Sequence, residues 1–180
     1  MMPLIKESDL ISDVLAVDLR SYSDDRGRFT EIFRKEWFPS HDWSMVQSNR
    51  SDSSSGVLRG LHYHHKQVDY WYVIKGTIRA GLVDLRKSSP TYLSSQTFEL
   101  NDRSDMGLLI PTGVAHGFFA VTEATLFYIV DHYYDGNDEF GVRWNDPEFG
   151  INWGTTDPLL SPRDQSNPRL DDIPLEDLPD

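Results

Sequence analysis

Hydrophobic residues occur along this chain in short runs that are separated by polar turns, and the runs are rich in valine, isoleucine, leucine and aromatic residues. No long stretch shows the helical period of about 3.6 residues. Runs of this kind predict β-strands, and many short strands in succession predict an all-β barrel or sandwich. The predicted strands lie at 14–19, 29–33, 57–64, 70–74, 77–86, 95–100, 108–110, 115–122 and 125–134.

The polar segments between these runs predict turns and irregular structure. Residues 21–28 predict a hairpin loop that joins the first two strands and projects Asp25, Arg26 and Arg28. Residues 34–43 predict a helical turn, which Pro39 keeps short. The serine-rich segment 51–56 is expected to be flexible.

Length and composition predict one globular domain. The chain has 180 residues, of which 38% are hydrophobic, so we expect a single domain over 1–180. The end of the chain is rich in proline, aspartate and leucine, so 155–180 is expected to be irregular, acidic and packed on the barrel. No apolar run approaches the ~20 residues of a membrane-spanning helix. The first residues lack the apolar core of a signal peptide, so we expect a cytoplasmic protein without membrane contact.

Charge and cysteine content narrow the function classes. The formal net charge is −12, which argues against nucleic acid or an anionic membrane as a partner, because both favour a basic face. A small phosphorylated ligand needs only a local group of arginines and stays compatible with this charge. The chain has no cysteine, which excludes disulfides and thiolate chemistry.

The predicted strand at 57–64 carries the most distinctive polar residues. Alternate side chains of a strand share a face, so His62 and His64 are expected to point the same way, beside Leu58 and Gly60. Histidine titrates near neutral pH and is a common metal ligand, so two on one face indicate a site. The alternative is a pair of surface histidines.

Two spacings indicate a fold. The first, G-x5-H-x-H-x4-D-x6-G, covers 56–76, and the second, P-x-G-x2-H, covers 111–116. Together they resemble the two-part cupin pattern, in which two strands of a jelly-roll barrel turn their polar side chains into one barrel mouth. Cupins usually have glutamate where Asp69 stands and asparagine where Ala120 stands. The resemblance implies a cupin-type jelly roll with short peripheral helical segments.

A narrower resemblance covers about 150 residues. Seven motifs, DDRGRFTEIFR, QSN, VLRGLHY, VDLRKSSPTY, IPTGVAHGF, FYIVDHYYDGNDE and WNDPEFGINW, occur in this order, and they resemble the dTDP-4-dehydrorhamnose 3,5-epimerase family. The resemblance implies an isomerase that inverts C3, C5 or both in a nucleotide-linked 4-keto-6-deoxy sugar, with dTDP as the expected nucleotide and with no cofactor. Such a reaction belongs to deoxysugar, rhamnose or cell-surface polysaccharide biosynthesis.

The resemblance also implies catalytic roles. A C4 ketone acidifies the protons on C3 and C5, so a base can form an enolate that is then reprotonated from the opposite face. His62 matches the base, Asp164 the carboxylate that orients it, and Tyr128 the acid. Alternation along the strand allows Tyr128 to point inward. Without the resemblance, an inward tyrosine is more often a core residue, and Asp164 is more often a surface acid.

Further residues are implied to bind the nucleotide sugar or support its pocket. Members of the family usually form dimers that exchange N-terminal strands, so the resemblance implies that residues 1–45 lie at a dimer interface. Strict strand geometry turns Arg59 away from His62 unless Gly60 marks a bulge. Taken alone, His116 could also be a core histidine. The implied substrate-binding residues are Arg26, Glu31, Gln47, Asn49, Arg59, His116, Glu139 and Arg163.

Asp69 is the departure that matters most, because the family usually has a lysine there whose cation stabilises the enolate. Lys66 and Asp69 are candidates for support, with Asp69 pairing with Lys66 or His64. We expect no bound metal, because a metal-bound His62 is not a free base. The alternatives are a metal-dependent cupin with ligands His62, His64, Asp69 and His116, or a non-catalytic protein that binds sugar nucleotides.

Overall fold

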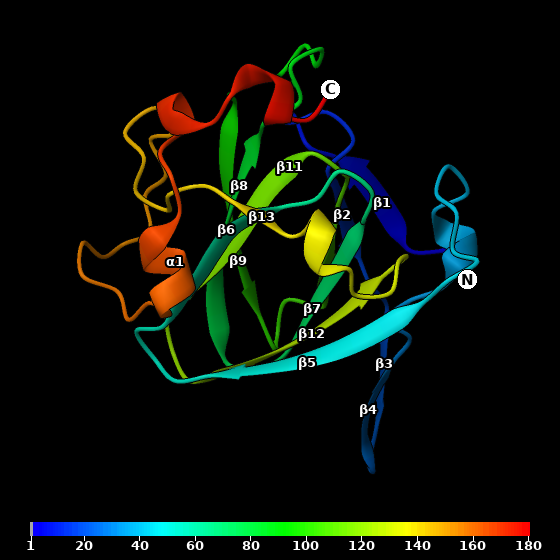
Figure 1. Ribbon diagram of the computed structural model, residues 1–180. Coiled ribbons are helices and arrows are strands. Elements are labelled where there is room, and N and C mark those ends of the chain that lie inside the picture. The colour runs from blue at the N-terminus through cyan, green and yellow to red at the C-terminus, as the bar shows by residue number, and fades with distance from the viewer. Residues whose placement is uncertain (1) are drawn as a thin grey trace.

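The computed structural model describes residues 2–180, and its framework is two antiparallel sheets that face each other (Figure 1). The first sheet has six strands in the order β1 (Leu4–Glu7), β2 (Leu15–Asp18), β10 (Met106–Ile110), β7 (Asp69–Lys75), β12 (Ala124–Val130) and β5 (Gln47–Ser53). The second has five, in the order β13 (Phe140–Gly141), β6 (Leu58–Tyr63), β11 (Val114–Ala120), β8 (Thr77–Asp84) and β9 (Ser95–Asn101). This arrangement confirms the predicted all-β jelly roll.

The remaining elements are short and lie outside the two sheets. The hairpin of β3 (Ser21–Asp24) and β4 (Gly27–Thr30) projects from the body of the molecule (Figure 1). No helix within residues 2–180 is long and apolar enough to cross a membrane. The helical segments are η1 (Lys35–Trp37), η2 (Gly136–Asp138), α1 (Pro162–Ser166), η3 (Leu170–Asp172) and η4 (Leu175–Asp177).

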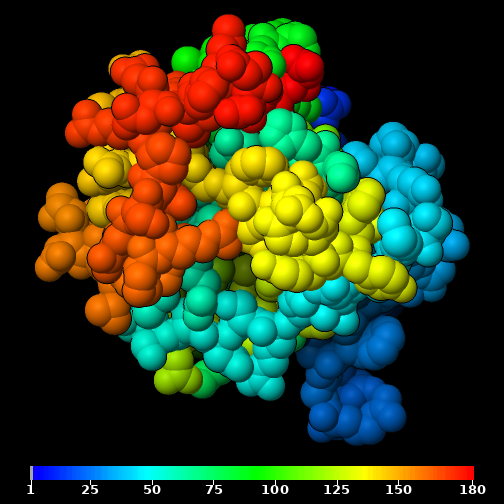
Figure 2. Space-filling model, in the orientation of Figure 1, coloured from blue at the N-terminus to red at the C-terminus, as the bar shows by residue number. Residues whose placement is uncertain are grey.

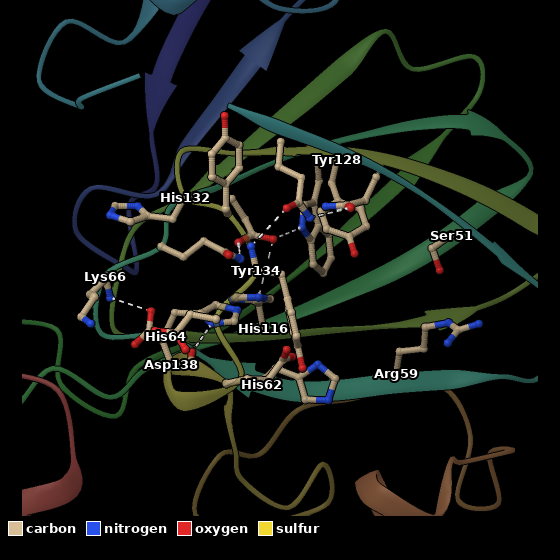
Figure 3. Close-up of a pocket in the computed structure, with 18 of the residues that line it drawn as sticks. Ser51, Arg59, His62, His64, Lys66, His116, Tyr128, His132, Tyr134 and Asp138 are labelled. Carbon is tan, nitrogen blue, oxygen red and sulfur yellow. Dashed lines mark hydrogen bonds and ion pairs between the residues drawn. The ribbon is translucent and has the colours of Figure 1, made fainter. Parts of the chain in front are cut away.

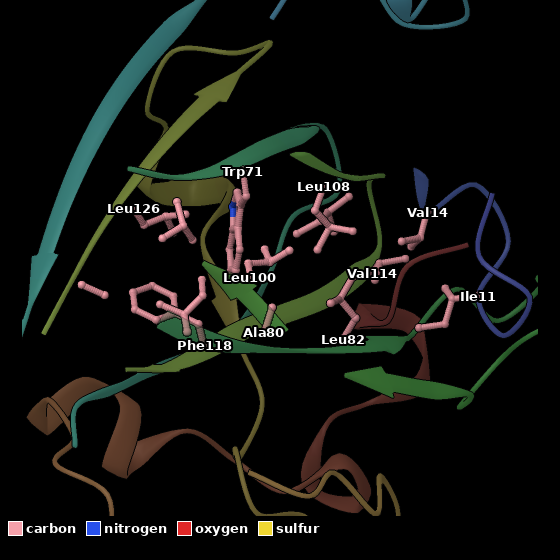
Figure 4. Close-up of a cluster of buried hydrophobic side chains, with 14 residues drawn as sticks. Ile11, Val14, Trp71, Ala80, Leu82, Leu100, Leu108, Val114, Phe118 and Leu126 are labelled. Atoms are coloured by element: carbon pink, nitrogen blue, oxygen red, sulfur yellow. The ribbon is translucent and has the colours of Figure 1, made fainter. Parts of the chain in front are cut away.

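The main core lies between the two sheets (Figure 4). Strand β7 shows how alternation builds it: Trp71 and Val73 face this core, whereas Tyr70 and Tyr72 belong to a second cluster on the outer face of the sheet. Burial of such a large side chain contributes roughly 1.5–3 kcal/mol. Beside this core lies a polar pocket, whose lining includes Asp69 at the start of β7.

Both outer faces of the sandwich are covered. Trp37, Phe38 and Trp43 pack over the six-stranded sheet. Residues of the C-terminal segment, among them Trp153 and Leu170, pack over the five-stranded sheet, as predicted for this part of the chain. This covering brings α1 to the end of β6, where the site lies.

Two sequence-based predictions of local structure are wrong. Residues 51–56 are expected to be flexible, but the first half of this segment belongs to β5, which pairs with β12 from Gln47 to Ser53. The residues of β5 are polar because one face lies in solvent and the other lines the pocket, so the hydrophobic signal is missing. The predicted hairpin of 14–19 with 29–33 does not form. Strand β2, within 14–19, pairs with β1 and β10, and the projecting hairpin consists of β3 and β4.

Candidate active site

A pocket of about 630 Å³ opens between the two sheets. Figure 2 shows it as a hollow bordered by β5, by the segment 131–139 and by the region of α1. Its walls come from β5, β6, β7, β11 and β12, so both sheets contribute side chains. A pocket of this size, lined by polar and aromatic side chains, suits a small-molecule ligand.

His62 lies at one wall of this pocket (Figure 3). It forms a hydrogen-bonded pair with Asp164. The Nε2 atom of His62 lies 2.6 Å from Oδ1 of Asp164, and Ser161 Oγ donates to the other carboxylate oxygen at 3.0 Å. Burial raises the pKa of Asp164, but the hydrogen bonds and charge of His62 and the bond from Ser161 hold it below its ordinary value. With Nε2 directed to this carboxylate, Nδ1 is the other ring nitrogen of His62 and the one left for proton transfer. His62 is thus prepared to take a proton.

Local sequence explains how Asp164 reaches His62. Ser161 caps α1 by accepting a hydrogen bond from the backbone N–H of Asp164, and Pro162 occupies the first turn. Asp164 is 4% exposed although it lies in an acidic segment. The cap therefore turns one acid of that segment inward.

Tyr128 lines the pocket from β12, in the opposite sheet to His62. Burial raises its pKa, and the charges of Asp69 and Glu139 raise it further. The phenol is therefore protonated at neutral pH and has a proton to give. A base and an acid on opposite walls are what inversion of a carbon requires.

A bulge in β6 brings Arg59 into the pocket together with His62. The pairing with β11 shifts register between the partners of His62 and Arg59, and Gly60 between them has a φ of +117°. A Cβ atom at Gly60 would lie 2.7 Å from the Cα of Gly117, so the position favours glycine. Gly60 thus marks the bulge that strand geometry required for Arg59 to face the same pocket as His62. The prediction that Leu58 shares a face with His62 is wrong, because Leu58 packs in the outer cluster.

A second group of polar residues lies deeper in the same pocket. The ligand atoms of His64, Asp69 and His116 all lie within 4.8 Å of one another, and the three side chains are buried. Asp69 Oδ2 is 3.9 Å from Nε2 of His116. Burial lowers the pKa of His116 to about 4 against the opposing charge of Asp69, so this imidazole is neutral at neutral pH. Of the four metal ligands that the cupin alternative predicts, three lie together and His62 lies outside their group.

Asp69 does not have the predicted partners. Its Oδ1 accepts a hydrogen bond from Gln67 Nε2 at 2.8 Å, and its Oδ2 accepts one from Trp71 Nε1 at 3.1 Å. The prediction that it pairs with Lys66 or His64 is therefore wrong. The cause is that Asp69 begins β7, so Trp71, two residues along the strand, lies on the same face.

His64 is held by a residue that sequence reasoning missed. Its Nδ1 lies 2.6 Å from the carbonyl oxygen of Asp138, and the Asp138 carboxylate accepts the backbone N–H groups of His65 and Lys66. Asp138 is buried and belongs to the segment that borders the pocket. Only its position beside Glu139 in the motif GNDE could have drawn attention to it.

Most predicted substrate-binding residues line the pocket. Gln47 and Asn49 project from β5, and the amide of Gln47 donates to Asn49 Oδ1 at 2.9 Å. Glu139 also lines the pocket and forms an ion pair with Arg163 at 3.0 Å. Two exposed aromatic residues, Tyr133 and Tyr134, also line the mouth of the pocket and were not predicted as site residues. The signal for them is the double tyrosine of the motif FYIVDHYYDGNDE.

Arg26 and Glu31 do not reach this pocket. Arg26 lies at the turn of the projecting hairpin, where its side chain is 91% exposed and pairs with Asp24. Glu31 pairs with Arg34 at 2.5 Å. Within one chain, these two residues are therefore separate from the site.

Comparison with known proteins identifies relatives over most of the chain. A family model described as dTDP-4-dehydrorhamnose 3,5-epimerase matches residues 9–172. A dTDP-4-dehydrorhamnose 3,5-epimerase of Neisseria gonorrhoeae is 39% identical over 86% of this chain, which spans 49% of that protein. A dTDP-4-dehydrorhamnose 3-epimerase of Streptomyces niveus is 36% identical over 86% of this chain and 78% of its own length.

A solved structure is also similar. It is dTDP-6-deoxy-D-glucose-3,5-epimerase from Legionella pneumophila in complex with dTDP-4-keto-L-rhamnose, with a TM-score of 0.91 and 32% identity. The match covers 98% of this chain and 97% of that structure. The similarity therefore includes the whole pocket.

Proposed function

This chain belongs to the dTDP-4-dehydrorhamnose 3,5-epimerase family, and we propose that it epimerises C3, C5 or both in a dTDP-linked 4-keto-6-deoxy sugar. The observation that carries the proposal is the His62–Asp164 pair facing the same pocket as Tyr128. The relatives include a 3,5-epimerase and a 3-epimerase, so the number of carbons inverted is part of what must be measured.

In the proposed reaction, His62 removes the proton from the carbon beside the ketone. The electron pair of the broken C–H bond forms the enolate, and negative charge develops on the C4 oxygen. Asp164 stabilises the imidazolium that results, because its carboxylate already accepts the Nε2 proton. Tyr128 then gives its proton to the other face of the carbon, which inverts it.

The nucleotide is proposed to occupy the outer part of the pocket. Arg59 supplies a cation for a diphosphate, and its Nε donates to Ser53 Oγ at 3.0 Å, which orients the guanidinium. Gln47, Asn49 and the Glu139–Arg163 pair supply polar groups at the same mouth. A net negative chain can therefore still bind a phosphorylated sugar.

We further propose a homodimer in which the hairpin of β3 and β4 contacts the neighbouring subunit. Tyr22 and Phe29 on this hairpin are 54% and 69% exposed, and a two-stranded hairpin alone is marginally stable. Arg26 and Glu31 would then serve the neighbour's site. Light scattering should report a dimer, and Phe29→Ser should shift it toward monomer, with Leu175→Ser, an exposed residue elsewhere, as the control.

The test of the proposed reaction is hydrogen exchange in D2O with dTDP-4-keto-6-deoxyglucose, read by NMR at C3 and C5. The expected result is deuterium at one or both carbons together with the inverted product. A protein that binds the nucleotide sugar without any exchange would be a non-catalytic binding protein, and the proposal would fail.

A further inference from the structure

The side chains of His64, Asp69 and His116 meet in the pocket without a hydrogen-bond donor between them. The Nδ1 of His64 faces the carbonyl oxygen of Asp138, and the Nδ1 of His116 faces that of Val114 at 2.9 Å. A carbonyl oxygen only accepts, so both Nδ1 atoms must carry the proton. In each ring Nε2 is therefore the nitrogen that is left to bind a ligand.

Asp69 adds a third acceptor to this meeting point. Its two donors, Gln67 and Trp71, approach from outside the group, and its Oδ2 also faces His116 Nε2 at 3.9 Å. Three lone-pair atoms that converge in a buried place repel one another unless a cation lies between them. A single water offers two protons to the three acceptors.

We infer that His64, Asp69 and His116 bind one first-row divalent metal ion at the inner end of the pocket. Two imidazoles and a carboxylate are ligands that such ions accept, and three protein ligands leave a position open for a ligand from the pocket. The Nδ1 hydrogen bonds to backbone carbonyls are also the arrangement that fixes metal-binding histidines in the correct tautomer. At metal–ligand distances of about 2.1 Å, the atoms would have to close by about an ångström from their present separations.

The site is compatible with a free base at His62. The sequence-based expectation of a metal-free protein rested on competition for His62, and the structure removes that competition, because His62 pairs with Asp164 instead. If the proposed function holds, on which this step rests, the ion replaces the lysine implied at position 69 by the family resemblance. It would stabilise the charge that develops on the C4 oxygen while the C–H proton passes to His62.

Metal binding is tested without substrate, with Co²⁺ as the probe. Chelator-treated protein is titrated with Co²⁺ by calorimetry, and the visible absorption of the bound ion is followed. We expect one Co²⁺ per chain for the wild type. His64→Asn and Asp69→Asn should each weaken Co²⁺ binding by about 100-fold or more. Mutation of a residue that only hydrogen-bonds to a metal ligand already lowers metal affinity about 10–100-fold.

Two histidine variants serve as controls. His65→Asn changes the exposed neighbour of His64, and His62→Asn changes the histidine assigned as base, and both should bind Co²⁺ like the wild type. Wild-type protein that binds no Co²⁺, or binds it no better than His64→Asn, would overturn the site and leave a shared proton or water between the residues. Equal loss in His62→Asn would overturn the three-residue assignment.

Unfolding of a variant is separated from loss of a ligand by circular dichroism of the metal-free proteins. If Asp69→Asn does not fold, His64→Asn decides the question alone. Because no sugar nucleotide is present, failure of the metal site leaves the proposed epimerisation standing. A wild-type protein that binds Co²⁺ without exchanging the sugar protons would instead remove the proposed function and keep the site.

Discussion

Two histidine–aspartate groups share one pocket and are arranged in opposite ways. His62 directs Nε2 to the carboxylate of Asp164, so Nδ1 is the proposed base and the carboxylate supports it. His64 and His116 direct Nδ1 to backbone carbonyls, so Nε2 is the nitrogen of each ring that is left for the group with the third residue, Asp69. The comparison teaches that the partner of one imidazole nitrogen decides what the other can do, and we propose proton transfer for one group and cation binding for the other.

The largest expected effect comes from removing the base. His62→Ala should lower deuterium incorporation at C3 by about 10²–10⁴-fold, because general base catalysis contributes about that much. The rate is measured by NMR in D2O, with His65→Ala as the matched control. An exchange rate in His62→Ala close to that of the wild type would assign the base elsewhere.

Loss of the proposed cation should have the next largest effect. Chelator treatment or Asp69→Asn should lower epimerisation roughly 10–100-fold, while the fold and the affinity for dTDP stay nearly unchanged. Activity that returns when one divalent ion is added to the wild type, but not to Asp69→Asn, is the expected pattern. Full activity in the chelated wild type would support the sequence-based expectation of a metal-free enzyme.

Tyr128→Phe should separate exchange from inversion. The base still removes the proton, so deuterium incorporation should stay within about tenfold of the wild type, while the inverted product falls further. Both quantities are read from the same NMR sample. If they fall by the same factor, Tyr128 has a structural role and is not the acid.

The smallest effect is on stability and depends on pH. The folded-state pKa of Asp164 lies below the ordinary value of 3.8, so its carboxylate contributes stability above that pH and loses it as pH falls through the folded pKa. Asp164→Asn should lower the free energy of unfolding by about 1–3 kcal/mol at pH 7.

The difference between wild type and Asp164→Asn should shrink below about pH 3.8. Urea unfolding at pH 7, 4 and 3 measures it, with Asp171→Asn, an exposed acid of the same segment, as the control. A difference that grows on acidification would mean that the folded-state pKa of Asp164 is raised.

Much of the fold could be predicted because hydrophobic alternation reports which strand faces are buried. Strands β6 to β12 were predicted near their observed positions. Strand β5 was missed because its inward face lines a polar pocket, and β1 because it is a short edge strand with mostly exposed side chains. Alternation also placed Leu58 on the wrong face, since a bulge at Gly60 breaks the period.

The resemblance identified His62, its partner Asp164 and six further residues of the pocket, and the roles of all of them stay proposals. The six are Gln47, Asn49, Arg59, His116, Tyr128 and Glu139. The partners of Asp69 could not be predicted, because hydrogen bonds from Gln67 and Trp71 depend on side-chain geometry rather than on residue type. The contact of His64 with Asp138 could not be predicted either. The two residues are far apart in the sequence, and the acceptor is a backbone carbonyl, which does not depend on the side chain at that position.

One paired measurement tests most directly whether the two groups divide the work. His62→Ala and Asp69→Lys are each assayed for Co²⁺ binding and for C3 exchange in D2O. The predicted result is a crossed one: His62→Ala binds one Co²⁺ per chain without appreciable exchange, whereas Asp69→Lys binds no Co²⁺ but exchanges the proton with or without chelator, because lysine supplies the cation. Loss of Co²⁺ binding and of exchange together in both variants would contradict the division, since the two groups would then act as one site.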